Sequence, residues 1–435
     1  MNVISVDLWG QRVGALSWDD ERQLASFQYE PAFIQSALDV SPIKAPLSNA
    51  VFEFAELAGT NTFKGLPGFI ADSLPEKFGN RLLDTYLASH GRHIDSLNPL
   101  ERLCYVGSRG MGALEYQPDQ EDRQLNKAIP VEVSDLVEVA KNVLKVRQNV
   151  SANLDLNINQ NSRDEKGIET LISVGTSAGG AKAKAVIAIN ANTNDVLSGQ
   201  TNVPEGYEHW LLKFDEIDNE EHATNKQIGR IEYAYSEMAY AAGINMMECR
   251  LLADNDRAHF MTKRFDRVDG NDKVHVVTFA GMAHVDRDPP GNVGYERLFQ
   301  TIRDLGLPQS DLSEMYRRMV FNICTRNQDD HTKNHAFIMF GDGHWQLSPA
   351  YDLCFSYQAD NPFIAQHQMS CNGKRDNFEL DDLLAAAKSA DVSRPREIIA
   401  QVENAVLHWQ EHAEKTGIKE EHAASIGNLY RHFTY

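Results

Sequence analysis

The stretch that decides the fold reads Arg-Asn-Gln-Asp-Asp-His-Thr-Lys-Asn and covers residues 326–334. It follows apolar side chains at helical spacing that lead up to Thr325, and it precedes a strand-like run, residues 335–340. The plain alternative to a functional loop is an ordinary polar connection between a helix and a strand. Such connections usually carry fewer charged groups than this one, so the pattern favours a functional site.

Two residues of this stretch, Asp329 and Asn334, are five positions apart. The same spacing occurs in the catalytic loop of protein kinases, where the Asp accepts the hydroxyl proton and the Asn binds Mg²⁺. His331 and His335 lie four positions apart, which on a helix would suit Zn²⁺ and a metal hydrolase. Because a strand-like run begins at Asn334, the two rings need not share a face, and the zinc interpretation is the weaker one.

A further acidic position follows after two strand-like runs, residues 336–340 and 345–347, which a Gly-Asp-Gly turn joins. This position is Asp352, in the sequence Tyr-Asp-Leu. A loop, a hairpin and then an Asp is the order in which kinases present their second metal ligand, and hard oxygen ligands suit Mg²⁺. Asn334 and Asp352 are therefore candidate metal ligands. The alternative is a purely structural Asp whose side chain caps a turn.

Small residues crowd positions 175–184, immediately before a strand-like run at 185–189. Small side chains let backbone N–H groups approach an anion closely, and Lys182 and Lys184 add positive charge. This pattern indicates a phosphate-binding loop, although it is neither a Walker A loop nor GxGxxG. The alternative is a flexible surface turn between strands.

Lys213 lies near the end of an apolar run, residues 209–214. A Lys at a strand end is often only a solvated charge. Beside the small-residue loop, however, its ammonium would reach the phosphates of a nucleotide, as the strand lysine of kinases does. Glu232, on the helix predicted over 231–242, is the candidate partner of Lys213, and an exposed helix Glu is an equally good interpretation.

Length and composition bound the class of protein. At roughly 150 residues per domain, 435 residues suggest about three folding units, or two with insertions, and a hydrophobic fraction of 42% is typical of globular chains. With 42 basic and 62 acidic residues the net charge is −20, which disfavours free-standing nucleic-acid binding but permits DNA to be reached beside a basic partner. We find no apolar run of about 18 residues and no signal-peptide pattern. Five scattered Cys residues indicate reduced thiols, so we expect a cytoplasmic protein with no membrane partner.

The order of sequence patterns divides the chain into four parts. Residues 1–117 mix strand and helix patterns and are expected to form an N-terminal α+β domain. Residues 118–166 hold a polar linker, a helix and an Asn/Asp/Ser-rich insertion at 149–166. Residues 167–275 are expected to form a β-rich nucleotide-binding lobe, and residues 276–435 a helical catalytic lobe. The expected fold class is therefore α+β, with a bilobal protein-kinase-like domain after the N-terminal domain.

Hydrophobic periodicity also predicts individual elements within these parts. Strands are expected at residues 3–9, 13–18, 185–189, 210–214, 250–252 and 260–265. Helices are expected at residues 77–89, 134–144, 231–242 and 312–323, and around 380–387 and 402–409. Gly243 is expected to end the helix that precedes it.

Together these motifs resemble those of the HipA family of bacterial toxin kinases, and the resemblance covers most of the chain. Residues 66–83 and 107–112 resemble the family's N-terminal domain. The segments that resemble its kinase domain follow in the family's order: 177–184, Lys213, 231–233, 263–267, 327–334 and 349–353. The pattern Asn-x-Asp-x-His-x-Lys-Asn with the later Tyr-Asp-Leu is the most specific part. The resemblance implies a serine/threonine-protein kinase that uses ATP and Mg²⁺.

The resemblance also implies roles for single residues in the second half of the chain. Asp329 would be the catalytic Asp, and His331 would support its loop and lie at the nucleotide. Asn334 and Asp352 would hold Mg²⁺, with Asp352 also near the nucleotide. Lys213 would bind the ATP phosphates.

Further implied roles concern the nucleotide. Residues 263–265, with Lys263 and Phe265, would lie against the adenine and pair with it through the backbone. Ser177 occupies the position of the family's autophosphorylated Ser. The other implied phosphate contacts are Ala178, Gly179, Gly180, Ala181 and Lys184. Lys182 and Ala185 depart from the residues that are common in the family at these two positions.

The biology that the resemblance implies is a toxin held inactive by a small basic DNA-binding antitoxin of the HipB type, which would bring it to operator DNA as a co-repressor. The implied target class is aminoacyl-tRNA synthetases, whose phosphorylation stops translation and promotes dormancy. A net charge of −20 fits a basic partner. Phosphate on Ser177 would add roughly −1.5 to −2 charges and is expected to expel its loop from the ATP phosphates. The alternative is a catalytically idle, kinase-shaped component of a DNA-bound repressor complex.

Overall fold

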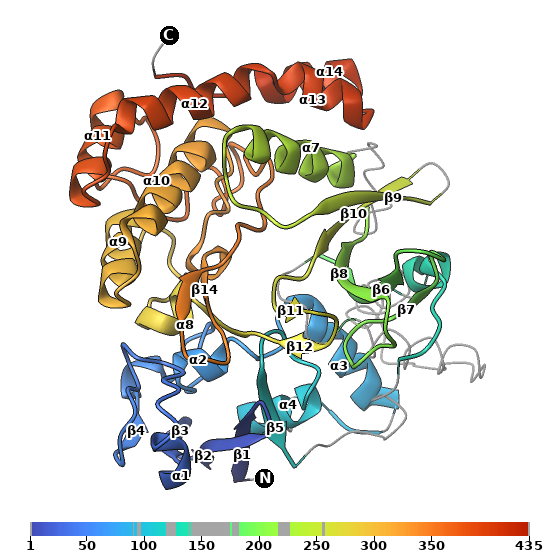
Figure 1. The fold of residues 1–435 in the computed structure, drawn as a ribbon, viewed down its shortest axis with the longest axis vertical. Helices are drawn as coiled ribbons and strands as arrows, with labels where there is room; N and C mark the ends of the chain where they lie inside the picture. The colour runs from blue at the N-terminus through green and yellow to red at the C-terminus, as the bar shows by residue number, and fades with distance from the viewer. Residues whose placement is uncertain are drawn as a thin grey trace.

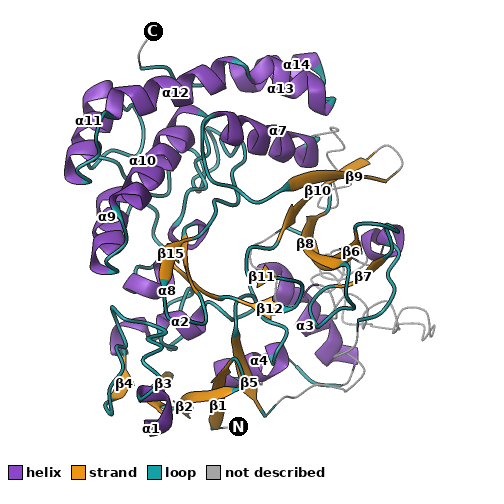
Figure 2. Ribbon diagram, in the orientation of Figure 1, coloured by secondary structure: helices purple, strands orange, loops and turns teal. Residues whose placement is uncertain are grey.

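The computed structural model describes residues 2–89, 91–93, 97–118, 128–138, 140, 175, 182–215, 227–254 and 257–433. These residues form an N-terminal α+β domain, a β-rich lobe and a helical lobe, which are drawn in Figure 1 and, by secondary structure, in Figure 2. The predicted α+β class, with a bilobal region after the N-terminal domain, is confirmed. The insertion at 149–166 and the loop at 177–181 lie outside the described residues.

The N-terminal domain is built on a five-stranded antiparallel sheet with the order β4-β3-β2-β1-β5. Its strands are β1 (Val3–Leu8), β2 (Gln11–Asp19), β3 (Leu24–Tyr29), β4 (Val51–Glu53) and β5 (Leu114–Gln117). Ile4, Val6 and Leu8 alternate along β1 and are buried, as the sequence pattern predicts. The strands predicted at 3–9 and 13–18 are therefore confirmed, and they pair as a hairpin.

Helical segments lie in the same part of the chain, and the first and the last of them contact the sheet. They are α1 (Pro31–Ile34), the 3₁₀ turn η1 (Ala55–Leu57), α2 (Gly68–Ala71), α3 (Lys77–Ser89) and α4 (Pro99–Val106). The predicted bounds of α3 are confirmed. Asn98 and Glu101 form a capping box that begins α4, because each side chain accepts a hydrogen bond from the other residue's backbone N–H.

The β-rich lobe is a second five-stranded antiparallel sheet, with the order β7-β6-β8-β10-β9. Its strands are β6 (Lys184–Asn190), β7 (Val196–Ser198), β8 (Tyr207–Lys213), β9 (Cys249–Asp254) and β10 (Arg257–Lys263), and a small ribbon, β11 (Arg267–Val268) with β12 (Asp272–Lys273), follows. The four strands predicted here are confirmed, although Phe265 lies beyond the end of β10. Helix α7 (Ile228–Ala241) lies between β8 and β9 in the chain, and Gly243 follows it with a φ of +78°, as predicted for a helix end.

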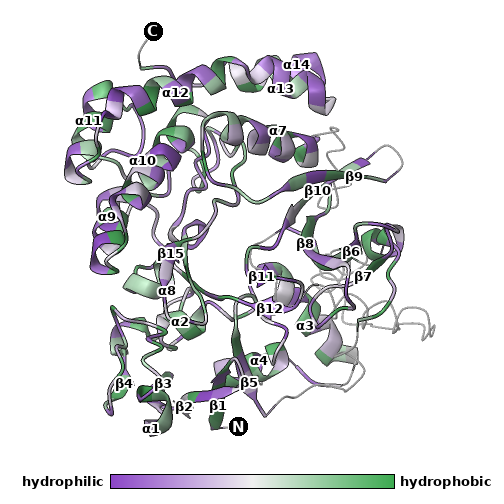
Figure 3. Cartoon of the chain, viewed as in Figure 1, coloured by the Kyte–Doolittle hydropathy of each residue, from purple (hydrophilic) through white to green (hydrophobic). Residues whose placement is uncertain are grey.

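The helical lobe contains α8 (Phe279–Ala283), α9 (Tyr295–Asp304), α10 (Gln309–Cys324), α11 (Leu380–Ser389), α12 (Pro395–Leu407), α13 (Trp409–Thr416) and α14 (Glu420–Gly427). The apolar face predicted for α10 is buried: Leu312, Met315, Tyr316, Met319, Val320 and Ile323. Hydrophilic and hydrophobic residues alternate along the outer helices α11 to α14 in Figure 3, as expected for helices with one buried face.

A three-stranded antiparallel sheet lies inside the helical lobe, formed by β13 (His275–Thr278), β14 (Ala336–Met339) and β15 (Trp345–Leu347). The predicted hairpin of residues 336–340 and 345–347 is confirmed as β14 and β15. Strand β13 is not predicted from the sequence, because its residues, His-Val-Val-Thr, do not alternate between polar and apolar side chains. It pairs with β14, in which Val277 lies opposite Phe337.

The remaining structural expectations concern the helix predicted at 134–144, the cysteines and membrane spans. Residues 133–138 and 140 are helical, and the rest of that predicted helix lies outside the described residues. All five Cys residues are buried free thiols, as their scattered spacing predicts. Among the helices in the described part of the chain, none has the length and hydropathy that a membrane span requires.

Candidate active site

The stretch 326–334 connects the end of α10 to the start of β14 and folds back on itself. Arg326 turns the chain with a left-handed φ of +58°. His331 caps the 3₁₀ turn η3 (Thr332–Asn334), and its Nδ1 accepts the backbone N–H of Lys333 at 3.3 Å. Asn334 donates its Nδ2 to the carbonyl of Asp329 at 2.8 Å. This bond joins the two ends of the predicted Asp-to-Asn spacing and leaves the amide oxygen of Asn334 as the group to meet a cation.

The two neighbouring carboxylates of this loop have opposite surroundings. Asp330 is buried and accepts hydrogen bonds from the Tyr295 hydroxyl at 2.7 Å, His367 Nδ1 at 2.8 Å and the Gln368 backbone at 2.8 Å. Burial alone would raise the pKa of Asp330, but His367 and these hydrogen bonds outweigh it and the pKa is lowered. Asp330 therefore anchors the loop as an ionised group.

Asp329, in contrast, has a side chain that is 51% exposed. Its pKa is raised, first by partial desolvation and also by the carboxylate of Asp352, while His331 acts in the opposite direction. A carboxylate with a raised pKa is a stronger proton acceptor. The arrangement of an anchored Asp330 beside an exposed Asp329 suits a general base held on a fixed loop.

Lys213 closes β8, and its ammonium bridges two carboxylates, Glu232 of α7 and Asp352. The Lys213 and Glu232 side chains are buried, whereas that of Asp352 is 37% exposed. Burial would lower the pKa of Lys213, but the two carboxylates raise it. The predicted pairing of Lys213 with Glu232 is confirmed, and the alternative of an exposed Glu232 is wrong. Lys184 of β6 lies directly opposite Lys213 of β8 in the sheet. The last residue of the predicted phosphate loop is therefore next to Lys213.

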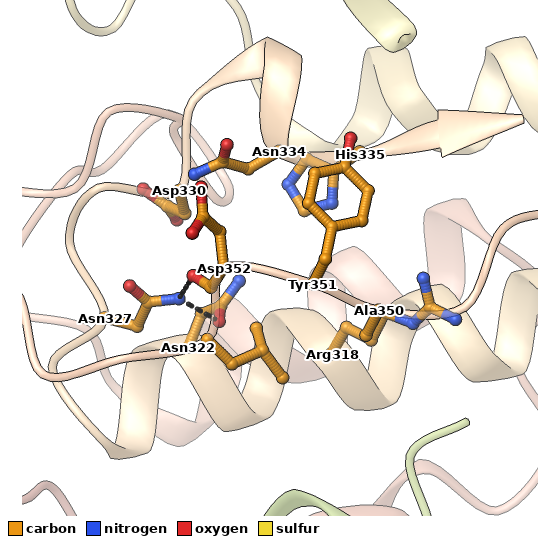
Figure 4. A pocket seen from close by; sticks show the side chains of 10 residues that line it. Arg318, Asn322, Asn327, Asp330, Asn334, His335, Ala350, Tyr351 and Asp352 are labelled. Carbon is orange, nitrogen blue, oxygen red and sulfur yellow. Dashed lines mark hydrogen bonds between the residues drawn. The ribbon is translucent and has the colours of Figure 1, made fainter. Parts of the chain in front are cut away.

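Asp352 and Asn334 line one small cavity, together with Asn327 and Asp330 (Figure 4). Asp352 has a left-handed φ of +56°, which is uncommon for a residue with a side chain and is tolerated where the surroundings hold it. Asn327 helps to hold it, since its Nδ2 donates to the Asp352 carbonyl at 3.4 Å and to Asn322 Oδ1 at 2.9 Å. Burial would raise the pKa of Asp352, but Lys213 and Lys184 lower it. An ionised carboxylate and an amide oxygen thus face one space.

The zinc interpretation of His331 and His335 is not supported by these surroundings. His331 caps η3, whereas His335 is buried with its ring 5.8 Å from that of Tyr295. In the described ranges, no group of three or more His, Cys, Asp and Glu side chains is placed to hold a metal ion. A Mg²⁺ site needs fewer protein ligands, because one or two carboxylates combine with waters and phosphates.

The segment predicted to meet adenine, residues 263–265, begins with the last residue of β10 and continues beyond that strand. Lys263 Nζ pairs with Glu208 at 2.7 Å, and the ring of Phe265 lies 5.7 Å from that of Tyr351. The backbone N–H groups of Lys263 and Arg264 donate to carbonyls within the lobe, each at 2.9 Å. If the backbone of residues 263–265 pairs with adenine, it would therefore do so through the N–H of Phe265 or through the carbonyls of these residues.

The structure leaves some predicted site residues untested and adds others. Ser177, Ala178, Gly179, Gly180 and Ala181 lie outside the described residues, so the phosphate loop and the autophosphorylation site stay predictions. Lys184 is buried at the start of β6, where burial lowers its pKa and Asp352 opposes this effect.

Sequence reasoning misses three residues around the site: Asp330 as an anchor, Tyr351, and Glu76 of the N-terminal domain. Glu76 pairs with Lys333, and Tyr351 donates its hydroxyl to the Lys333 carbonyl at 2.8 Å. All three lie inside segments quoted above for other reasons, 326–334, the Tyr-Asp-Leu sequence and 66–83, and nothing local indicates these roles.

Two family models match the chain, and together they span most of it. Residues 4–117 match the HipA N-terminal domain, and residues 176–416 match the HipA-like C-terminal domain, which alone is more than half of the chain. The chain belongs to the HipA family. The resemblance predicted from the motifs is therefore confirmed.

A solved structure and a curated protein are also similar to this chain. The fold is similar to that of HipA from Shewanella oneidensis MR-1, solved in a toxin–antitoxin complex with HipB and operator DNA, at 18% identity and a TM-score of 0.64. The likeness covers 98% of this chain and 95% of that chain. A stretch of 91 residues is 35% identical to the Sinorhizobium fredii protein named "Putative kinase Y4dM". That match covers 21% of this chain and spans only 22% of the relative's length.

Proposed function

We propose that this HipA-family chain is an ATP- and Mg²⁺-dependent serine/threonine-protein kinase and the toxin of a HipA–HipB type pair. The observation that carries the proposal is the ammonium of Lys213, which bridges Glu232 and Asp352 beside the loop of Asp329 and Asn334. Phosphoryl transfer requires a cation on the phosphates, oxygen ligands for a metal and a base for the incoming hydroxyl. The same site offers all three.

Lys213 would contact the phosphates of ATP. Its two carboxylate partners keep it protonated and fix its direction, so no reorganisation is needed when phosphates arrive. Lys184, opposite it in the sheet, is the last residue of the predicted phosphate-binding pattern, 175–184. Phe265 and the carbonyls near it would form the adenine side of the site.

Asn334 and Asp352 would hold Mg²⁺, since an amide oxygen and a carboxylate are the hard donors that this ion prefers. Asp352 is ionised before any metal arrives, because Lys213 lowers its pKa. Bound there, Mg²⁺ would neutralise charge on the transferred phosphoryl group. Asn334 is kept in place by its bond to the Asp329 carbonyl, so the metal position and the base are fixed by one loop.

Asp329 would accept the proton of a Ser or Thr hydroxyl. Its exposed carboxylate is open to a protein substrate, and its raised pKa strengthens it as a base. We extend the same chemistry to autophosphorylation of Ser177. Aminoacyl-tRNA synthetases are proposed as the target class on the family resemblance alone.

The proposed partner is a small basic antitoxin of the HipB type, through which the chain would reach operator DNA as a co-repressor. A net charge of −20 supports a basic partner, and the similar Shewanella HipA was solved with HipB and operator DNA.

The proposal is tested by the intact mass of the purified chain with Mg²⁺ and ATP. Unmodified protein is expected to gain one phosphate that maps to Ser177. Asp329→Asn and Ser177→Ala are expected to prevent the gain. If protein that begins unphosphorylated binds ATP and gains no phosphate, the kinase proposal fails, and the idle component of a repressor complex takes its place.

A further inference from the structure

The connection between α2 and α3, residues 72–76, joins a helix that packs against the helical lobe to one that packs against the β-rich lobe. Helix α2 contributes to the main core, together with α8 of the helical lobe, which lies beside it in Figure 1. On the other side, Phe78 and Leu82 of α3 belong to the separate core of the β-rich lobe, together with Trp210. The N-terminal domain therefore packs against both lobes, and this short connection lies between the two packing surfaces.

The first end of this connection is tied to the helical lobe by Asp72. Its carboxylate accepts the Thr278 backbone N–H at 2.7 Å and the Thr278 hydroxyl at 2.8 Å. Thr278 is the N-cap of α8, and its hydroxyl also accepts the Gly281 N–H at 3.1 Å. A second bond runs from the Gly68 N–H to His284 Nε2 at 3.1 Å. The N-terminal domain is thus hydrogen-bonded to both ends of α8.

Glu76, four residues after Asp72, reaches the stretch 326–334. Its Oε1 lies 2.5 Å from Lys333 Nζ, and both side chains are largely buried, at 15% and 12% exposed. Arg287 approaches the other carboxylate oxygen at 3.9 Å. Burial would raise the pKa of Glu76, but Lys333 and Arg287 lower it to about 2, so the Glu76 carboxylate is ionised near neutral pH.

Lys333 is therefore held at three points, one of them the bond from its backbone N–H to His331 Nδ1, and its neighbour in the chain is Asn334. Its ammonium binds Glu76, and its carbonyl accepts the Tyr351 hydroxyl. Asn334 in turn holds the carbonyl of Asp329. Removing one charge from a largely buried pair leaves the other uncompensated, so Lys333 would be driven to a new position. Such a shift would displace the proposed metal ligand Asn334 and the proposed base Asp329, which belong to the same short loop.

We infer that Glu76 of the N-terminal domain is a positioning residue of the catalytic loop, acting through Lys333. This inference deepens the proposed kinase function and rests on it. The N-terminal domain is then a working part of the phosphoryl-transfer site, because it holds the loop and packs against both lobes at once.

The test is a double-mutant cycle with Glu76→Gln, Lys333→Gln and the double variant. Glu76→Gln is expected to lower kcat about 10- to 100-fold, the range for misplacing catalytic groups by about 1 Å, with little change in the KM for ATP. If Glu76 acts through Lys333, the second substitution adds little to the first. Glu76→Asp keeps the charge on a shorter side chain and is expected to lose less than Glu76→Gln. Glu53→Gln is the matched control, because Glu53 forms an exposed ion pair with Arg22 at 2.8 Å in the same domain.

A second readout does not depend on turnover. Amide hydrogen exchange of residues 329–335 is expected to be faster in Glu76→Gln than in the unaltered protein and in Glu53→Gln, with exchange in β9 unchanged. If the unaltered protein transfers no phosphate but this exchange responds, the kinase proposal fails and the positioning of the loop stands. If the unaltered protein is active and Glu76→Gln changes neither kcat nor exchange, the inference is overturned.

Discussion

Lys213 of β8 and Asp352 of the segment after β15 form an ion pair that joins the β-rich lobe to the helical lobe. Glu232 binds the same ammonium from α7, so one cation is shared by carboxylates from two other elements. The pair therefore does two things at once. It fixes the relative position of the two lobes, and it keeps a cation and an ionised carboxylate next to each other where phosphates and a metal would meet.

Replacing Lys213 by Met tests this arrangement. The substitution leaves Glu232 and Asp352 without their shared cation, and both the lobe contact and the charge on the phosphates are lost. We expect ATP turnover to fall on the order of 10² to 10³, the usual cost of removing a preorganised charge. Lys374→Met is the control, since Lys374 pairs with Asp382 at 2.7 Å and its side chain is 40% exposed. Equal turnover in the two variants would contradict the role of Lys213.

Asp329→Asn separates proton transfer from binding. The side chain is half exposed, so the substitution is expected to leave the unfolding free energy nearly unchanged. The loss of the base is expected to lower kcat on the order of 10² to 10⁴, with ATP binding retained. Calorimetric titration with ATP and Mg²⁺, beside a turnover assay, measures both quantities. The exposed Asp360 provides the control variant Asp360→Asn, and a matching loss there would argue against a specific role for Asp329.

Asp330→Ala is expected to have the opposite profile, a large loss of stability. Three donors, from Tyr295, His367 and the Gln368 backbone, would be left buried without their acceptor. Leaving a buried donor without its acceptor typically costs roughly 1 to 3 kcal/mol for each donor, so we expect a loss of several kcal/mol. Denaturant unfolding monitored by fluorescence measures this cost. An unfolding free energy within error of the unaltered protein would show that Asp330 does not anchor the loop.

The sequence predicts best those features whose partners are close in the chain. The buried face of α10, the β14–β15 hairpin and the Lys213–Glu232 pair all follow from local periodicity or from neighbouring elements. The anchoring of Asp330 by His367 and the pairing of Glu76 with Lys333 do not. Nothing in the sequence around either carboxylate indicates its partner, and only the packing of distant segments brings the two partners to Asp330 and Glu76. Sequence patterns therefore identify the loop that holds the candidate catalytic residues, but they do not identify the distant side chains that keep this loop in position.

The last prediction concerns acid stability and His275. This side chain is buried in β13, with Nε2 bonded to the Val40 carbonyl at 3.1 Å, and burial lowers its pKa from 6.5 to about 4. Between these two pH values His275 is protonated in the unfolded chain but neutral in the folded chain. The free energy of unfolding therefore rises with pH in this range, and it falls as the pH drops from about 6.5 towards 4. For this one group the loss between pH 7 and pH 5 is about 2 kcal/mol.

His275→Gln checks this directly, because Gln can still donate to the Val40 carbonyl and does not titrate. The difference in unfolding free energy between pH 7 and pH 5 is expected to shrink by about 2 kcal/mol in the variant. His408→Gln is the control, since His408 lies exposed on the outer helices with its Nδ1 near the Asn404 carbonyl at 2.7 Å. If the pH dependence of stability is the same in His275→Gln, then His275 takes up its proton in the folded protein. That result would contradict the lowered pKa that burial of His275 predicts.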